Sequence, residues 1–154
     1  MKRTVRQFNV DEVSGLTYIL LFHINNSHYL EIGKLGWHYF HSGYYIYIGS
    51  AKKFIKRRLT RHLSRQKNQF WHIDYLLSNP VSSEIINIWT SHFACECTIS
   101  QELYQNKICT LVKKGFGSSD CHCIAHFFRI NKDDLDILNQ ILNNRYFYSL
   151  ANKH

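Results

Sequence analysis

A run of basic side chains directly follows a tyrosine-rich segment, and this combination suits phosphate chemistry. The basic segment from Lys52 to Gln66 comes after Tyr47, which lies close to a glycine. If residues 53–66 form a helix, spacings of three, four and seven residues place several cations near one face. Fixed cations beside a phenol can bind and cleave a phosphodiester, with one histidine as a proton shuttle or phosphate contact. A solvated basic helix that only contacts nucleic acid is the alternative. The side chains concerned are Arg58, Arg61, His62 and Arg65.

Glu96 is the most informative carboxylate. Residues 95–106 are expected to be helical, and Glu96 then falls on the same side as Ile99 and Leu103. An acid on the inward side of a helix costs free energy unless a cation meets it. We therefore expect Glu96 to bind Mg²⁺ or Mn²⁺, hard cations that prefer oxygen ligands. A buried ion pair with one of the helix arginines is the alternative.

Two tyrosines, Tyr18 and Tyr47, are candidates for activating a water molecule. Both lie in segments rich in β-forming residues, and the two strands can be neighbours that face one site. A phenol, with an ordinary pKa of about 10, is a poor base at neutral pH. Nearby arginines and a metal ion favour its ionised form, which can take a proton from water. The alternative is that both are ordinary core or rim residues.

Two further segments offer binding chemistry. Residues 71–75, Trp-His-Ile-Asp-Tyr, could form a wall on which bases stack, with His72 as a substrate contact, or could pack in the core. The loop Gly115 to Asp120 could cradle a phosphate with its amides and hydroxyls, or be a tight structural loop. It lacks the Gly-Lys-Ser/Thr ending of a P-loop.

Four of the five cysteines fall into two Cys-x-Cys pairs, with His126 three residues after the last of them. Four such thiols could ligate Zn²⁺, although structural zinc sites more often leave two to four residues between ligands. Buried free thiols are the default expectation. The pairs are Cys95 with Cys97 and Cys121 with Cys123.

Strands and helices that interleave along the chain must position these groups. The segment 43–49 carries apolar or aromatic side chains on both faces, so we expect an interior strand that ends at Gly49, with Ser50 as the N-cap of the next helix. Asn131 and Asp134 form a variant capping box for a C-terminal helix. We expect strands over 17–24, 28–32, 43–49, 83–89 and 124–130, a short edge strand or irregular link over 37–41, and helices over 53–66, 69–77 (ended by Asn79-Pro80) and 95–106. The first strands together are expected to form an antiparallel meander.

Length and composition limit the possible classes. A chain of 154 residues is most simply one domain, here an α+β domain over 15–154 with a C-terminal helix and a lead-in over 1–14. The net charge of +8 favours a polyanionic partner, of which nucleic acid is the commonest. The apolar runs are too short to cross a membrane. No secretory signal is evident and the number of cysteines, 5, is odd, so we expect a cytoplasmic protein with reduced thiols.

In this order the motifs resemble the GIY-YIG nuclease superfamily. The stretch 47–51, Tyr-Ile-Gly-Ser-Ala, is similar to its second half-motif, and Leu16-Thr17-Tyr18 to its first, although the Gly-Ile pair is missing. Arg58 and Glu96 match the family's arginine and metal-binding glutamate. The chain is more closely similar to the Uri-type endonuclease branch, whose recurring runs correspond here to residues 49–51, 58–63, 71–77, 96–97 and 115–123.

The resemblance implies a small three-stranded sheet core flanked by helices that hydrolyses phosphodiester bonds in DNA. A tyrosine would activate water, Arg58 (or its neighbour Arg57) would bind the phosphate, and Glu96 would hold one Mg²⁺ or Mn²⁺. The alternatives are a nucleic-acid-binding module of the same fold without cleavage, and a basic, zinc-stabilised interaction domain. The expected substrate contacts are Lys52, Arg57, Arg61, Arg65 and His72.

Overall fold

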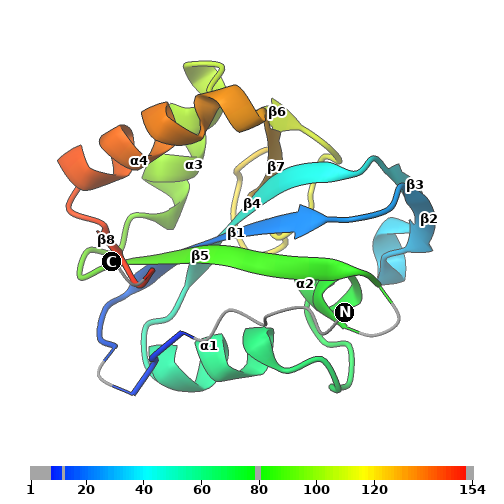
Figure 1. The fold of residues 1–154 in the computed structure, drawn as a ribbon, viewed down its shortest axis with the longest axis horizontal. Coiled ribbons are helices and arrows are strands. Elements are labelled where there is room, and N and C mark those ends of the chain that lie inside the picture. Colours follow the sequence, from blue (N-terminus) through cyan, green and yellow to red (C-terminus); the bar gives the residue numbers. More distant parts are fainter. Residues whose placement is uncertain (1–7, 12, 79–80, 152–154) are drawn as a thin grey trace, which may run out of the picture.

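The computed structural model describes residues 8–11, 13–78 and 81–151, and it confirms the α+β class. Six strands form one sheet in the order β6-β7-β4-β1-β5-β8, and every pair of neighbours is antiparallel (Figure 1). The predicted strands over 17–24, 43–49 and 83–89 are present as the three middle ones. The strands are β1 (Thr17–Ile24), β4 (Gly43–Ser50), β5 (Ser83–Ser91), β6 (Thr110–Leu111), β7 (Phe127–Ile130) and β8 (Tyr148–Ser149).

Each face of the sheet has its own hydrophobic core, and each core is covered by a different pair of helices (Figure 1). Alternation along β4 sends Tyr45 and Tyr47 to one face, and Ile46 and Ile48 to the other. On the tyrosine face lie α1 (Ile55–Leu63) and α2 (His72–Leu77), and on the other lie α3 (Glu96–Gln105) and α4 (Leu135–Asn144). The expected interior position of β4 is confirmed, since it lies between β1 and β7.

The predicted meander of the first strands is wrong. β1 pairs directly with β4, while β2 (His28–Glu31) and β3 (Trp37–Phe40) form a separate hairpin. The physical reason is exposure: alternate side chains of the hairpin face solvent, with Tyr29 at 69% and Trp37 at 66%. Such strands cannot occupy the middle of a sheet that is covered on both faces. The 3-10 turn η1 (Gly33–Leu35) joins the hairpin strands.

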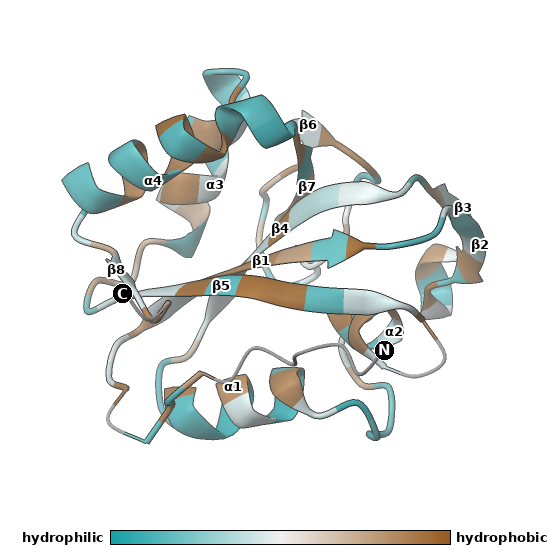
Figure 2. Cartoon of the chain, in the orientation of Figure 1, coloured by the Kyte–Doolittle hydropathy of each residue, from teal (hydrophilic) through white to brown (hydrophobic). Residues whose placement is uncertain are grey.

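Helix α1 is shorter than the predicted 53–66. Ser50 is not its N-cap, because β4 continues through Ser50 and the helix begins at Ile55, after Phe54 in a left-handed conformation with φ 68°. The carbonyl of Ser50 instead accepts a hydrogen bond from Arg58. The apolar side chains Ile55 and Leu59 face the sheet as expected, and Figure 2 shows hydrophobic colour on that side of α1.

The remaining elements match the sequence expectations in part. The predicted box at Asn131 is wrong, since Asn131 makes no side-chain capping bond and precedes a 3-10 turn, η2 (Lys132–Asp134), before α4. The strand predicted over 124–130 begins only at Phe127, and β8, which was not predicted, follows α4. Asn79-Pro80 lies outside the described residues. Within the described part of the chain, no helix has the length and apolar character needed to cross a membrane.

Candidate functional site

A cleft of about 430 Å³ opens beside the C-terminal end of β4, on the side of the sheet that carries Tyr47. One wall is basic and aromatic and comes from the start of α1 and the segment before α2. The opposite wall comes from the start of α3 and the loop between β6 and β7. Five residues expected to act in the site line this cleft, namely Tyr47, Lys52, Arg58, His72 and Glu96.

Tyr18 lies directly behind Tyr47. It faces Gly49 across the β1–β4 pair, and a Cβ atom at position 49 would overlap its ring, so this close approach requires glycine. The rings of Tyr18 and Tyr47 lie with their centroids 6.3 Å apart. The Tyr18 hydroxyl is 2.7 Å from Nε2 of His62. Tyr18 is buried and does not line the cleft, whereas Tyr47 does.

Both phenols are held in the neutral form. Burial raises the pKa of Tyr47 to about 12, and Arg58 lowers it only partly. Burial also raises the pKa of Tyr18 well above its usual value, with the neighbouring Tyr47 adding to the effect. Desolvation of the phenols therefore outweighs the expected effect of the nearby arginines, which favour ionisation.

His62 points into the core and not into solvent. It follows Ile55 and Leu59 at positions i+7 and i+3, so it shares the face of α1 that meets the sheet. Burial lowers the pKa of His62 to about 3, with Lys67 as the next cause, so the imidazole is neutral near pH 7. His62 can therefore orient Tyr18 but does not act as a surface cation.

The arginines do not form one free row. Arg58 lies over the Trp71 ring at 5.3 Å, and Arg61 lies over the same ring at 5.1 Å. Arg57 is exposed and lies over Phe54 at 5.3 Å, outside the cleft. Arg65 follows the helix and donates to the Leu77 carbonyl at 3.0 Å, so it joins α1 to the end of α2. Of the predicted arginines, only Arg58 lines the cleft.

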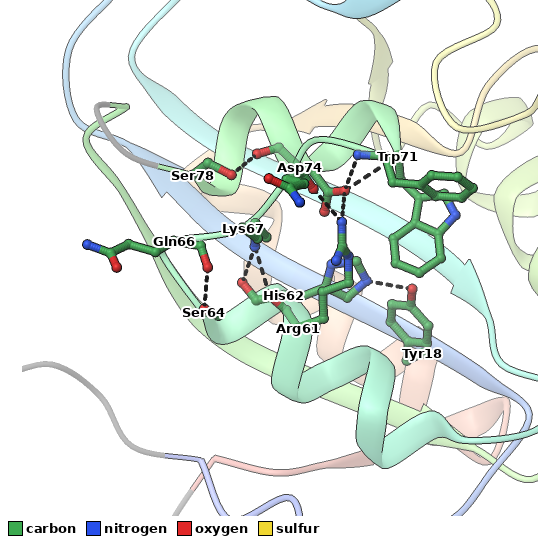
Figure 3. A network of polar contacts seen from close by, with 11 residues as sticks. Tyr18, Arg61, His62, Ser64, Gln66, Lys67, Trp71, Asp74 and Ser78 are labelled. Atoms are coloured by element: carbon green, nitrogen blue, oxygen red, sulfur yellow. Dashed lines mark hydrogen bonds and ion pairs between the residues drawn. The ribbon is translucent and has the colours of Figure 1, made fainter.

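Asp74 holds the aromatic wall in place, and the sequence analysis assigned it no role. Its Oδ2 accepts hydrogen bonds from the amides of Phe70 and Trp71, each at 2.9 Å, and from Arg61 at 2.9 Å (Figure 3). Its side chain is fully buried. An acid three residues into a helix that follows Trp71 is a capping signal, and this pattern could have identified it.

Glu96 begins α3 and is half-buried at the cleft. None of the basic residues in the described ranges forms an ion pair with it, so the expected ion-pair alternative does not account for this carboxylate. The exposed carboxylate of Asp120 lines the same cleft. Carboxylate oxygens are the ligand type that hard divalent cations prefer, and a partly open cleft leaves room for bound water.

The thiols group differently from their sequence pairs. Cys97, Cys121 and Cys123 gather with His126, and their ligand atoms all lie within 4.8 Å of one another. Cys95 is not in this group, because its thiol lies 3.7 Å from the Thr17 hydroxyl. The Cys-x-Cys pattern identified three of the four grouped residues, and the nearby histidine was the signal for the fourth.

Comparisons with known proteins give one match. The chain has no significant match among curated proteins or among solved structures. The domain of unknown function DUF123 matches residues 17–146, which include the whole cleft. The chain therefore belongs to the DUF123 family.

Proposed function

We propose that this protein is a metal-dependent endonuclease that hydrolyses phosphodiester bonds in DNA, as its motifs' resemblance to GIY-YIG nucleases implies. The observation that carries the proposal is the shared cleft of Tyr47, Arg58 and Glu96. A phenol, a guanidinium and a carboxylate without an ion pair among the described residues are the groups that such a hydrolysis needs: one for the water, one for the phosphate and one for the cation.

The basic and aromatic wall supports a nucleic acid as the substrate. Arg58 is oriented by the Ser50 carbonyl and by the Trp71 ring, so its guanidinium is held at the cleft before a phosphate arrives. Lys52 lines the same cleft and Phe70, 79% exposed, stands at its edge, where a base can stack. The net charge of +8 would draw a polyanion toward this surface.

Glu96, with Asp120 lining the same cleft, would hold Mg²⁺ or Mn²⁺. When bound, the cation supplies Lewis-acid stabilisation of the leaving oxygen. Tyr47 would take the proton of the attacking water, because its side chain reaches the cleft. Its raised pKa must fall before it can do so, and Arg58 acts in that direction. Tyr18 and His62 are positioning residues that support Tyr47 from behind.

Binding without cleavage is the second candidate, and the neutral phenols favour it. With burial raising the pKa of Tyr47 to about 12, the ionised fraction at neutral pH is very small. A cleft with this chemistry would bind phosphates through Lys52 and Arg58 and stack bases on Phe70 without cutting. The two candidates share every contact except the one to the cation.

A cleavage assay separates them. Labelled single-stranded, duplex, flap and junction DNA, and RNA of the same sequence, are incubated with the protein with and without Mg²⁺. The nuclease proposal expects Mg²⁺-dependent products, a loss of about 100-fold or more in Glu96→Gln, and a similar loss in Tyr47→Phe. DNA binding measured in chelator should stay nearly unchanged in Glu96→Gln.

Glu102→Gln is the matched control, since Glu102 is on the same helix but pairs with Arg145 on the surface. It should cut like the original chain. If no substrate is cut but binding weakens steeply with salt, the binding module is correct. If binding does not change with salt, the nucleic-acid proposal is refuted in both forms.

A further inference from the structure

A cluster of sulfur and nitrogen atoms lies at the cleft, whose lining includes two of its four residues, Cys121 and His126, and the proposed hydrolysis does not use it. Cys97 comes from the first turn of α3, while Cys121, Cys123 and His126 come from the loop between β6 and β7. Two parts of the chain that are far apart in sequence thus present their metal-binding atoms at one point. No ligand of the proposed Mg²⁺ site belongs to this set.

The spacing of the atoms fits a tetrahedral metal. Nε2 of His126 is 3.8 Å from Sγ of Cys97 and 3.4 Å from Sγ of Cys121. A tetrahedral Zn²⁺ with Zn–S near 2.3 Å and Zn–N near 2.0–2.1 Å has S···N edges of about 3.6 Å and S···S edges of about 3.8 Å. All four ligand atoms lie within 4.8 Å of one another. Small side-chain rotations would therefore bring each pair of atoms to these tetrahedral distances.

The surroundings favour a metal over packed thiols. His126 is buried, at 5% exposure, yet its Nε2 meets thiol sulfurs, which are weak hydrogen-bond partners. The amide of Gln101 approaches Sγ of Cys123 at 3.9 Å and can donate to a metal-bound sulfur, as outer partners of metal ligands commonly do.

We propose that Cys97, Cys121, Cys123 and His126 bind one structural Zn²⁺ that fastens the β6–β7 loop to α3. Three thiolates and one imidazole fill all four positions of a zinc ion, so the site is closed and has no place for a substrate. The loop has little regular structure of its own. The hydrogen bonds Gly115 N to Ile124 O and His126 N to Phe116 O, both 2.8 Å, close its base, and turn bonds to Ser118 N and Cys121 N lie within it. A hydrogen bond from Gly117 N to Nδ1 of His72, at 3.1 Å, joins it to α2.

Because the loop lines the cleft, the proposed zinc would also affect the shape of the cleft wall. Gly117, Ser119 and Asp120 in the loop line one wall of the cleft, and Glu96 directly precedes Cys97. A metal that joins the loop to the start of α3 would fix these two parts of the same wall relative to each other. This inference concerns metal binding and loop order, so it holds or fails independently of whether the protein cuts nucleic acid.

The first test measures the metal content of the purified full chain. The protein is expressed in cells grown with zinc and is dialysed without chelator. We expect one zinc per chain in the original protein and in Cys95→Ser, which removes a thiol at the same helix start but outside the cluster. Cys121→Ser and Cys123→Ser should retain less than about a tenth of that zinc, because a lost ligand opens the site. Equal zinc loss in Cys95→Ser would overturn the proposal.

A second measurement needs no variant and covers the case in which the variants do not fold. The native chain is alkylated with and without a chelator, and the modified cysteines are mapped by mass spectrometry. Cys97, Cys121 and Cys123 should be protected by zinc and exposed by the chelator, and Co²⁺ added to the metal-free protein should give the visible spectrum of a tetrahedral thiolate site. A disulfide among these cysteines, bound iron in place of zinc, or alkylation unaffected by the chelator would refute the zinc site.

Discussion

The buried carboxylate of Asp74 allows the most detailed prediction, and the change is Asp74→Asn. Its Oδ2 is the common acceptor for the amides of Phe70 and Trp71 and for Arg61. Asparagine has the same size, and its oxygen can still accept from the two amides. It removes the charge, so Arg61 loses its ion-pair partner.

The expected cost follows from these contacts. A hydrogen bond to a charged group contributes about 1.5–3 kcal/mol, and a neutral one about 0.5–1.5 kcal/mol. The two amide bonds are weakened and the bond to Arg61 is lost, but Arg61 is 30% exposed and recovers part of its hydration. The free energy of unfolding should therefore fall by about 2–4 kcal/mol. For a chain of this size the melting temperature should fall by about 5–15 °C.

Urea denaturation near pH 7 measures this change. The matched control is Asp11→Asn, which makes the same substitution at an exposed ion pair, where Asp11 meets Lys56 at 3.3 Å. That variant should lose much less stability, because exposed pairs are screened by water and salt. Equal losses in the two variants would refute the argument that burial gives Asp74 its importance.

The pH dependence tests the charge itself. Burial alone would raise the pKa of Asp74, but hydrogen bonds from the amides of Trp71 and Phe70 and the interaction with Arg61 outweigh it, so the pKa lies below its usual value. An acid whose pKa is lowered by folding contributes stability that is fully present above its unfolded pKa of about 3.9. This stability is lost as the pH falls through the folded pKa. The difference in free energy of unfolding between the original chain and Asp74→Asn should be constant above about pH 5. It should become smaller below about pH 4. A difference that stays constant to the lowest pH at which the protein is folded would mean that the carboxylate is not charged.

Two other predictions concern the groups behind Tyr47. Gly49→Ala places a methyl group against the Tyr18 ring, so it should destabilise by about 1–3 kcal/mol, and an unchanged urea midpoint would contradict this packing. Because burial lowers the pKa of His62 to about 3, its ring should not titrate between pH 8 and pH 5 in an NMR experiment. The free energy of unfolding should fall as the pH drops from about 6.5 toward 3, because the unfolded chain binds the proton at a higher pH than the folded one. A His62 midpoint near 6.5 would show that the ring is not buried.

The alternation of side chains made the centre of the fold predictable. The strand predicted over 17–24 has the observed bounds of β1, and the two faces expected for β4 are the two faces it presents to the separate cores. Alternation does not determine which strands pair. For this reason β2 and β3 were predicted to lie in the main sheet, whereas they pair with each other in a separate hairpin. β6 and β8 have two residues each, too few for any pattern to show.

The site was harder to predict than the fold because it depends on where helices begin and on contacts between distant segments. His62 lies three residues after Leu59 and seven after Ile55, so it shares their inward face, whereas the predicted row of cations grouped it with the arginines. The sequence pairs of cysteines included Cys95, but the start of α3 directs Cys97 to the loop and leaves Cys95 beside Thr17. The cleft residues were predicted from their types and order, while the role of Asp74 in holding the aromatic wall was not.

Asp74 and the proposed zinc ion support opposite walls of the cleft by different chemistry. On one side Asp74 fixes the amides of Phe70 and Trp71, and this contact depends on a negative charge. On the other side the proposed zinc ion would fix the loop that carries Asp120, and this contact depends on bound metal. Acid well below pH 4 would protonate Asp74 and, by protonating the thiolates, would also release the zinc, so acid loosens both walls. A chelator at neutral pH separates them, because it should loosen only the loop and leave the aromatic wall in place. Because each wall contributes a different part of the cleft, hydrogen exchange in Phe70 and Trp71 and in the loop can be followed separately, and parallel loss of protection in both under a chelator would show that the two walls are not independent.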